Sequence, residues 1–329
     1  MELYRTYQVT ASGPDAHHDA LLSNLAVAAF STGVDEFVAD QIFPNVNVGK
    51  QSDRYAILNK GNFLRLTQNG ALRAPKTEAR RVEFEVSSDA YFADNYALAG
   101  DLALEDLANQ DNVFRLRQNT IMLITSVLRR EQEIRIANTV TSMSNLGSAT
   151  TLSGTSQWND YVNSDPMGDV STAHAFIENN TGLKANTMVV DKDTYRILRR
   201  HPDILDLYKY TAGGQATSDQ IKDVFEVDNM IVARGIKENS LEGGTASITN
   251  IWGNNCLLAH IEPATGVNTR TLGLRFQWRP AGFAAPFVVG TKRESGPGTA
   301  NIEIIETGHF QDEKIIAADL GYLIASTIS

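Results

Sequence analysis

The spacing of apolar residues predicts one unusually long helix, over residues 111–143. Apolar side chains recur there at intervals of three and four, the pattern of a helix with one buried face. At 1.5 Å per residue this helix would be about 50 Å long, whereas helices of globular proteins average about 11–12 residues. Asp111 is placed to cap its first turn. The positions that mark the face are Val113, Leu116, Leu123 or Ile124, Val127 and Ile134, with Thr120 and Glu131 interrupting them.

A long hairpin is predicted before this helix, between residues 54 and 86. Two apolar stretches flank Gly70 and Pro75, which favour a turn. Because so few of its residues are apolar, the hairpin cannot bury much of itself, and isolated hairpins are marginally stable in water. We therefore expect it to pack against other subunits. The residues that mark its strands are Phe63, Leu64 and Leu66 on one side and Val82, Phe84 and Val86 on the other.

The other predicted elements are shorter, and together they indicate an α+β fold. Residues 1–18 are a polar arm, residues 40–48 an extended segment and residues 144–168 a loop. The predicted helices cover residues 19–30 (ending at Gly33), 170–179, 191–200 with Asp191 as its cap, 203–208 after Pro202, and 219–225 with Ser218 as its cap. The predicted strands cover residues 187–190, 230–233, 251–261, 272–278, 301–307 and 315–326.

Charge changes sign sharply in front of the long helix. Residues 41–81 carry eight Lys or Arg against two acids, a net charge of +6. Residues 82–112 carry eight acids and no Lys or Arg, a net charge of −8. A small globular enzyme has no evident need for a basic excursion, an acidic segment and a long helix in series. The arrangement indicates a subunit that reaches onto its neighbours.

Composition limits the other classes of function. With 329 residues the chain can form one large domain or two smaller ones, and its net charge of −10 argues against binding nucleic acid by neutralising phosphates. The one cysteine, Cys256, lies in an apolar run and is expected to be a small buried residue. The apolar runs are far shorter than the ~20 residues of a membrane span, and the N-terminus lacks the apolar core of a signal peptide.

The candidate chemical motifs are weak. The glycine clusters at 211–215, 241–245 and 296–298 lack the spacing of a phosphate-binding loop. The carboxylate pairs on the predicted short helices suit helix-start electrostatics, and His17 and His18 lack the spacing and further ligands of a metal site. No nucleophile elbow or His-Glu-x-x-His motif occurs. We expect no enzyme activity, no cofactor and no metal, with a soluble α/β enzyme as the alternative from another class.

The order of these pieces resembles the major capsid proteins of tailed phages. The similar segments are DALLSNLAVAA at 19–29, FVADQIFP at 37–44, VGKQSDRY at 48–55, the strand and capped helix of 187–208 with HPDIL at 201–205, VDNMIV at 227–232 and DLGYLI at 319–324. They cover nearly the whole chain. Each is a structural signature, and their conjunction carries the resemblance.

The resemblance implies the Hong Kong ninety-seven type capsid fold. It would place an N-terminal arm at 1–35, an extended hairpin loop at 50–90, a peripheral domain at 91–179 and 291–329 with the spine helix at 111–143, and an axial domain at 180–290. It further implies hexamers and pentamers that close into an icosahedral shell around double-stranded DNA, without sequence-specific binding or a membrane. Such subunits are made in the bacterial cytoplasm, reside in the virion capsid, and work with portal, scaffolding and sometimes decoration proteins.

Within that scheme we expect the basic loop to lie on the acidic segment of an adjacent subunit. Fewer than twenty residues precede the first predicted helix, so scaffolding is expected to be a separate protein or absent. Lys60 and Lys76 lie in the loop, but the sequence names no partner for a covalent cross-link. An encapsulin-type protein nanocompartment, which shares the fold, is the nearer alternative. The residues expected at subunit contacts are Arg65, Arg73, Lys76, Arg80, Arg81, Glu83, Glu85, Asp89 and Asp94.

Overall fold

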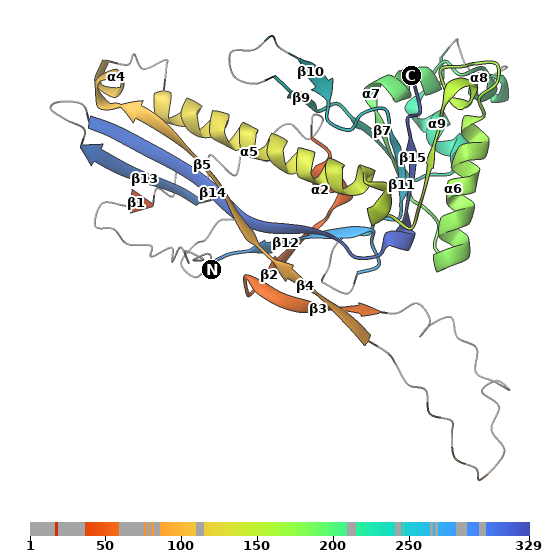
Figure 1. Ribbon diagram of the computed structural model, residues 1–329, viewed down its shortest axis with the longest axis horizontal. Helices are drawn as coiled ribbons and strands as arrows, with labels where there is room; N and C mark the ends of the chain where they lie inside the picture. The colour runs from red at the N-terminus through yellow and green to blue at the C-terminus, as the bar shows by residue number, and fades with distance from the viewer. Residues whose placement is uncertain are drawn as a thin grey trace, which may run out of the picture.

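A computed structural model gives the arrangement of two β-sheets around a long helix (Figure 1). It describes residues 17–18, 37–58, 76, 78, 81, 86–109, 115–208, 215–240, 245, 247–263, 266, 269–280, 288–295 and 301–329. The helix predicted at 19–30 and most of the predicted hairpin strands lie outside these residues.

The larger sheet is built on one long strand, β14 (Asn301–Ile315). Its described strands run in the order β1 (His17–His18), β13 (Val288–Ser295), β14, β12 (Gly273–Trp278) and β2 (Asn45–Val48), and β5 (Asp94–Ala103) also pairs with β14. The pairs are antiparallel except for β12 with β2. The strand predicted at 272–278 pairs with residues 310–315, because β14 runs beyond the predicted 301–307, whose residues pair instead with β13 and β5.

The long helix, α5 (Leu116–Thr141), crosses one face of this sheet over β5 and β14 (Figure 1). Gly100 of β5 allows the close approach, because a Cβ there would lie 2.6 Å from Cγ2 of Thr120. The helix is shorter than the predicted 111–143. Arg115 is its N-cap residue, not Asp111, and a separate 3₁₀ turn, η1 (Met143–Asn145), follows it.

The buried face of α5 also differs from the predicted one. Ile124 is buried as expected, but Leu123 is exposed, and Val127 and Ile134 are only half-buried. Several buried positions are polar because their side chains bond to residues distant in sequence, which the apolar spacing could not reveal. The buried residues are Ile121, Ile124, Thr125, Leu128, Arg129, Gln132, Glu133, Ile136, Ala137 and Val140.

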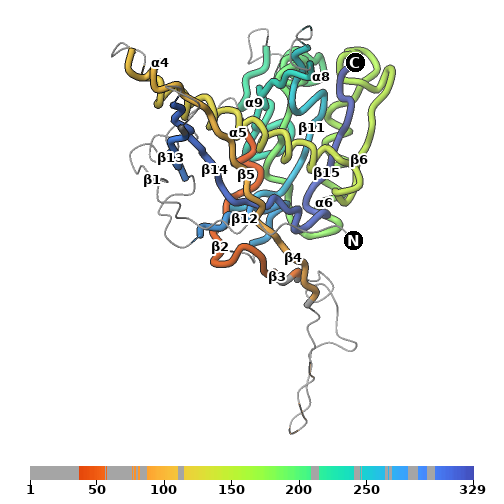
Figure 2. Tube along the Cα trace, turned by 60° about the vertical axis from the view of Figure 1, so that its left-hand side comes forward, coloured from red at the N-terminus to blue at the C-terminus, as the bar shows by residue number. Residues whose placement is uncertain are grey.

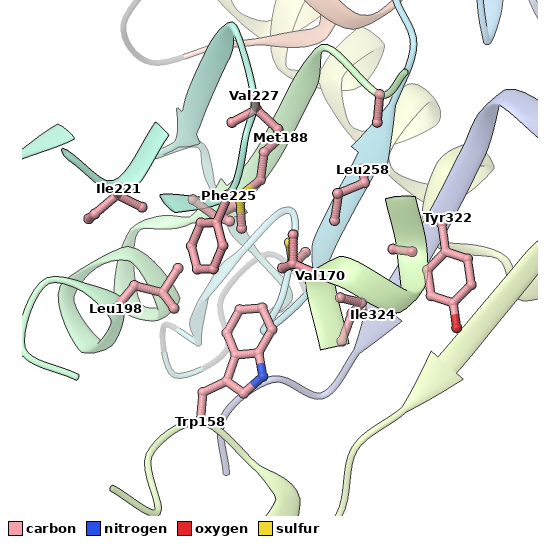
Figure 3. Close-up of a cluster of buried hydrophobic side chains, with 14 of the residues drawn as sticks. Trp158, Val170, Met188, Leu198, Ile221, Phe225, Val227, Leu258, Tyr322 and Ile324 are labelled. Atoms are coloured by element: carbon pink, nitrogen blue, oxygen red, sulfur yellow. The ribbon is translucent and has the colours of Figure 1, made fainter. Parts of the chain in front are cut away.

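A second unit is formed by a five-stranded sheet with helices on its face (Figure 1). Its described strands are β6 (Ser148–Thr151), β15 (Gly321–Ala325), β11 (Cys256–Ala259), β7 (Thr187–Asp191) and β8 (Asn229–Ala233), in that order. The helices are α6 (Pro166–Thr181), α7 (Lys192–Leu198), α8 (Pro202–Leu207) and α9 (Ser218–Val224). Figure 3 shows its core, where Trp158 and Met188 pack among Val170, Leu198 and Ile324.

Local signals position these helices. The carboxylate of Asp191 accepts the backbone N–H of Asp193 and caps α7 as predicted, and Pro202 begins α8. The cap of α9 is Thr217 and not the predicted Ser218, because Thr217 and Gln220 form a capping box. Smaller described elements complete the chain: α4 (Leu104–Asn109), β9 (Ile236–Glu238) paired with β10 (Ile248–Asn250), η2 (Gly154–Ser156) and η3 (Ala318–Leu320).

Several predicted segments need correction. The strand predicted at 251–261 is only β11 (Cys256–Ala259), and the strand predicted at 315–326 contains η3 before β15. Residues 40–48 are not wholly extended, since α2 (Ala39–Ile42) precedes β2. The predicted loop at 144–168 contains η1, β6 and η2. Strand partners also differ from those that the predicted domain bounds imply. β6, α6 and β15 join the sheet of β7 and β11, whereas β12 joins the sheet of β14.

Candidate intersubunit surfaces

A two-stranded ribbon, formed by residues 52–58 and 86–92, leaves the body of the subunit. β3 (Ser52–Leu58) pairs antiparallel with β4 (Val86–Phe92), in a register that sets Ser52 opposite Phe92 and Leu58 opposite Val86. Both views show this ribbon pointing away from the two large sheets (Figures 1 and 2). It is the described base of the hairpin predicted from the sequence.

Aromatic side chains anchor the base of the ribbon to the larger sheet. The rings of Tyr55 and Tyr91 lie 5.3 and 4.6 Å from the ring of Phe276 on β12, and all three are buried. A hydrogen bond between strands fixes the same place, since the backbone N–H of Phe92 donates to the Asp312 carboxylate at 2.9 Å. Such a base holds the direction of the ribbon before any neighbour is met.

The electrostatics of the base follow from partial burial. Burial raises the pKa of Asp312, although the bond from Phe92 opposes the shift. Burial, reinforced by the neighbouring Asp89 carboxylate, raises the pKa of Tyr55 above its ordinary value, so the phenol stays protonated and donates to Asp89 at 3.2 Å. At the exposed edge the Arg54 N–H lowers the pKa of Asp53, which also pairs with Lys50 at 3.2 Å.

Four of the residues predicted at subunit contacts are placed by the structure. Lys76, Arg81, Asp89 and Asp94 are all exposed. Asp89 lies on β4 and Asp94 begins β5, so they follow one another along the strands that lead from the ribbon into the larger sheet. Their contact with another subunit remains a prediction. The other predicted contact residues lie outside the described residues: Arg65, Arg73, Arg80, Glu83 and Glu85.

Arginine–carboxylate pairs fix α5 to the larger sheet near both of its ends. Arg117 makes two bonds of 2.7 Å to the nearly buried carboxylate of Glu303. Arg135 bonds to Glu313 at 2.9 Å, and its guanidinium lies 3.7 Å from the ring centroid of Tyr96. Paired, two-point contacts of this kind hold both position and orientation. The helix and sheet therefore form one stiff frame behind the ribbon.

Glu133 is a structural residue that the sequence reasoning missed. Its buried carboxylate accepts the N–H groups of Val38 and Ala39 at 3.0 and 2.7 Å and the indole N–H of Trp252 at 2.5 Å. Burial raises the pKa of Glu133, and these three bonds oppose the shift. The available signal was its position one turn before Ile136, on the buried face of the helix.

Ser164, His201 and Asp203 lie in a row that superficially resembles a catalytic triad. Ser164 Oγ lies 3.0 Å from His201 Nε2, and His201 Nδ1 lies 3.6 Å from the Asp203 carboxylate. Ser164 Oγ donates to the carbonyl of Asp160 at 2.7 Å, which leaves it to accept from His201. His201 is fully buried, and burial lowers its pKa. The row therefore ties a loop to the start of α8 and does not activate the serine hydroxyl.

Other chemical candidates give no further site within the described residues. No group of three or more His, Cys, Asp and Glu side chains there could hold a metal ion. No helix in the same residues is both long and apolar enough to cross a membrane. Cys256 is buried in the core as predicted, and burial raises the pKa of its thiol.

The chain is similar to two phage major capsid proteins along nearly its whole length. It is 26% identical over 316 residues to the major capsid protein of Burkholderia phage BcepMu, covering 93% of this chain and 95% of that protein. It is 23% identical over 316 residues to the major capsid protein of Pseudomonas phage JBD67, covering 94% and 97%. No family model matches the chain.

Solved structures share the fold at lower identity. A phage-related protein from Bordetella bronchiseptica RB50 superposes with a TM-score of 0.72 at 20% identity, covering 94% of this chain and 97% of that one. The mature capsid of bacteriophage PhiM1 gives 0.52 at 11% identity, covering 85% and 84%. A virus-like particle from Pyrococcus furiosus also gives 0.52 at 11% identity, covering 92% and 97%.

These likenesses confirm the resemblance predicted from the sequence. The solved structures show the α+β fold of tailed-phage capsid proteins. The names of the two relatives indicate a structural role rather than an enzymatic one. The chain is therefore similar over nearly its whole length to phage major capsid proteins, and it shares the fold of tailed-phage capsid subunits.

Proposed function

We propose that this subunit assembles through hexamers and pentamers and that its hairpin carries contacts between neighbours. The observation that supports this most directly is the base of the ribbon, anchored by Tyr55 and Tyr91 on Phe276 while the strands point away from the body. A two-stranded ribbon buries too little surface to be stable alone. A neighbouring subunit would supply the missing surface.

Apolar contact is expected to supply most of the binding energy. Exposed ion pairs are each worth about 0–1 kcal/mol, whereas obligate interfaces bury about 2,000 Å² or more at ~25 cal/mol/Å² of apolar area. Phe92, at the end of β4, leaves 53% of its surface exposed. Aromatic residues are enriched in interfaces, so Phe92 suits an apolar contact beside the ribbon.

Charge is expected to select the partner surface and its register. The basic side of the pair includes Lys76 and Arg81, both exposed. The acidic side would be the 82–112 segment of an adjacent subunit, where exposed carboxylates follow β5 into α4. Complementary charge steers association more than it adds affinity. The exposed acids of that segment are Asp89, Asp94, Asp101, Glu105 and Asp106.

The same proposal includes what the shell encloses and which other proteins take part in its assembly. The shell would enclose double-stranded DNA without reading its sequence, and a net charge of −10 would limit adhesion of the DNA to the protein. A portal and a scaffolding protein would act during assembly in the bacterial cytoplasm, and decoration proteins could bind outside. The β14 sheet with α5 would form the peripheral domain, and the β7 sheet would form the axial domain.

A protein nanocompartment is the second candidate, because the fold is shared by a virus-like particle as well as by a phage capsid. The two whole-length relatives, both phage major capsid proteins, favour the phage shell. Neighbouring genes separate the two candidates: portal and terminase genes support the phage shell, and a cargo-enzyme gene supports the nanocompartment.

Negative-stain microscopy of the expressed, purified protein tests the assembly proposal. Closed particles of uniform size, tens of nanometres across, are the expected result. Small discrete oligomers at every protein and salt concentration tested would contradict it, provided that circular dichroism shows a folded subunit.

A further inference from the structure

A pocket of about 220 Å³ lies between α6 and the end of α9, in the unit built on the five-stranded sheet. Part of its lining is apolar, and Val170 and Phe225 in that part also belong to the core shown in Figure 3. The ionisable residues of the lining are His174 and Glu178 of α6, and Glu226 just after α9. Ligand sites typically combine an apolar lining with a few polar groups, as this pocket does.

The hydrogen bonding of His174 leaves one ring nitrogen as an acceptor. Nε2 lies 2.9 Å from the carbonyl oxygen of Phe225, and a carbonyl can only accept, so Nε2 carries the proton. In the neutral ring, Nδ1 then keeps its lone pair. Nδ1 is buried, and none of the described residues donates to it. Because a buried acceptor without a donor costs free energy, a ligand that brings a donor into the pocket is favoured.

The two carboxylates of the pocket have no cation beside them in its lining, which contains no lysine or arginine. Glu178 lies in the last turn of α6, where the helix dipole favours positive charge, yet that turn carries no basic residue. Lys222, in the last turn of α9, pairs with Asp219 at 2.7 Å. The charges around the pocket therefore favour a cationic ligand.

Glu226 occupies a backbone position that glycine usually takes. Its φ is 52°, in the left-handed region. Its N–H donates to the carbonyl of Asp223 at 3.3 Å, and the N–H of Val227 donates to that of Lys222 at 3.0 Å, the Schellman pattern at a helix end. Glycine would suit this turn better than glutamate. What the glutamate adds at this position is a carboxylate beside the pocket.

We propose that this pocket binds a small organic ammonium ion, with its charged nitrogen near Glu178 and Glu226 and its alkyl chain on the apolar lining. The lone pair of His174 Nδ1 would be a further acceptor. A water molecule takes up about 30 Å³ of the liquid, so the pocket has room for an amine with a chain of a few carbon atoms. An ammonium ion needs only hydrogen-bond acceptors. Within the described residues, no group of three or more His, Cys, Asp and Glu side chains could hold a metal ion instead.

Binding at this pocket would connect α6 to the end of α9, because the ligand would contact residues of both. A ligand that binds only the folded chain stabilises it, and the effect grows with ligand concentration. The site lies within one subunit and does not depend on the proposed assembly.

Titration of the dissociated subunit with butylammonium chloride tests the site. The expected result is a saturable shift of the imidazole NMR signals of His174, identified by their loss in His174→Gln, together with a rise in Tm. Butanol, which has the chain without the charge, and sodium chloride, which has the charge without the chain, should produce neither effect at the same concentrations. No saturable shift, or an equal shift with sodium chloride, would overturn the proposal.

Two variants locate the binding within the pocket. Glu226→Gly removes one carboxylate and suits the left-handed backbone, so the subunit should stay folded, and Glu178→Gln removes the other with little change in size. Each is expected to raise the Kd for butylammonium about fivefold, the contribution of one exposed ion pair. Glu131→Gln, at an exposed carboxylate of α5, is the matched control and should leave the Kd unchanged. If circular dichroism shows both pocket variants folded and their Kd is that of the unmodified chain, the proposal is wrong.

Discussion

At the scale of single residues, buried titratable groups join parts of the chain that are far apart in sequence. Glu133, on the spine helix, accepts three hydrogen bonds, from the backbone of Val38 and Ala39 and from the Trp252 indole. His309 lies inside the larger sheet, 5.8 Å from the ring of Tyr96. Both groups stabilise the folded subunit. Substitution tests the role of Glu133, and a change of pH tests that of His309.

Glu133→Ala is expected to destabilise the subunit by about 3 kcal/mol or more. The substitution leaves two backbone N–H groups and an indole N–H buried without their acceptor, and each such loss costs about 1–3 kcal/mol. Denaturant unfolding of the dissociated subunit measures the change. Glu131→Ala, two residues earlier and exposed, should lie within about 0.5 kcal/mol of the unmodified protein. Equal effects of the two substitutions would refute this role of Glu133.

His309 should make the subunit sensitive to acid. Burial, with the nearby charges of Arg135 and Arg275, lowers the pKa of His309 from 6.5 to about 3. The unfolded chain therefore binds this proton more tightly, so stability is full above pH 6.5 and falls as the pH drops toward about 3. Between pH 6.5 and 5 the loss should be about 2 kcal/mol.

A pair of variants isolates this contribution. His309→Phe is expected to flatten the fall in unfolding free energy between pH 7 and pH 5 relative to the unmodified subunit. His174→Phe, at a half-buried histidine of α6, is measured over the same pH range so that the general effect of replacing a histidine by phenylalanine can be subtracted. Parallel pH profiles for His309→Phe and the unmodified chain would contradict the assignment.

At the scale of elements, the stiffness of the subunit depends on how closely α5 lies on the larger sheet. Gly100 on β5 faces Thr120 and Ile124, and any side chain there would meet atoms at 2.6 and 3.1 Å. The Arg117–Glu303 and Arg135–Glu313 pairs, near the two ends of the helix, hold α5 in a fixed position along β14. Helix and sheet should therefore behave as one cooperative unit.

Gly100→Val should cost about 1–3 kcal/mol of stability, the usual effect of overpacking. Gly290→Val is the matched control, because Gly290 also lies in a strand of the larger sheet but its Cβ would meet nothing within 4 Å. Thermal and denaturant unfolding of both variants measures the difference. A cost at Gly290 as large as that at Gly100 would argue against the close α5–β5 contact.

Elements with local signals were predictable, and those that depend on distant partners were not. The strand before Asp191 and its capped helix follow from a short apolar run and an N-cap. The parallel pairing of β2 with β12 joins residues 45–48 to residues 275–278, and no local pattern encodes it. The buried face of α5 was predicted wrongly because two of its residues are polar. Arg129 pairs with Asp40, and Glu133 accepts backbone N–H groups.

Only the charged residues of the proposed contact surface could be predicted from the sequence. The switch from basic to acidic residues identifies Asp89 and Asp94, both exposed in the structure. The aromatic base of the ribbon was missed, because Tyr55, Tyr91 and Phe276 come together only when three distant strands meet. Their separation in sequence hides the cluster.

At the scale of the whole molecule, the subunit is a stiff frame with a ribbon directed away from it (Figure 2). The frame joins the larger sheet and α5. The second sheet packs its helices on one face, and its other face shares a core cluster with the last turns of α5. A shape of this kind leaves much surface for neighbours. Its stability as a shell would come from many modest contacts repeated by symmetry.

Reversing the charge of Arg80 and Arg81 to Glu should block or misdirect assembly while the isolated subunit stays folded. The reversed side chains would repel the acidic segment that they are proposed to meet. Size-exclusion chromatography and microscopy report assembly, and circular dichroism reports folding. Arg80→Lys with Arg81→Lys keeps the charge and should still assemble. Normal particles from the reversed variant would remove the charge-based part of the proposal.

A cryo-electron microscopy reconstruction of the assembled particle tests the central claim most directly. The expected map has icosahedral symmetry, hexamers and pentamers of this fold, and a ribbon that extends from β3 and β4 over the acidic 82–112 segment of an adjacent subunit. A map in which the ribbon lies against its own subunit, or particles without closed symmetry, would contradict the account.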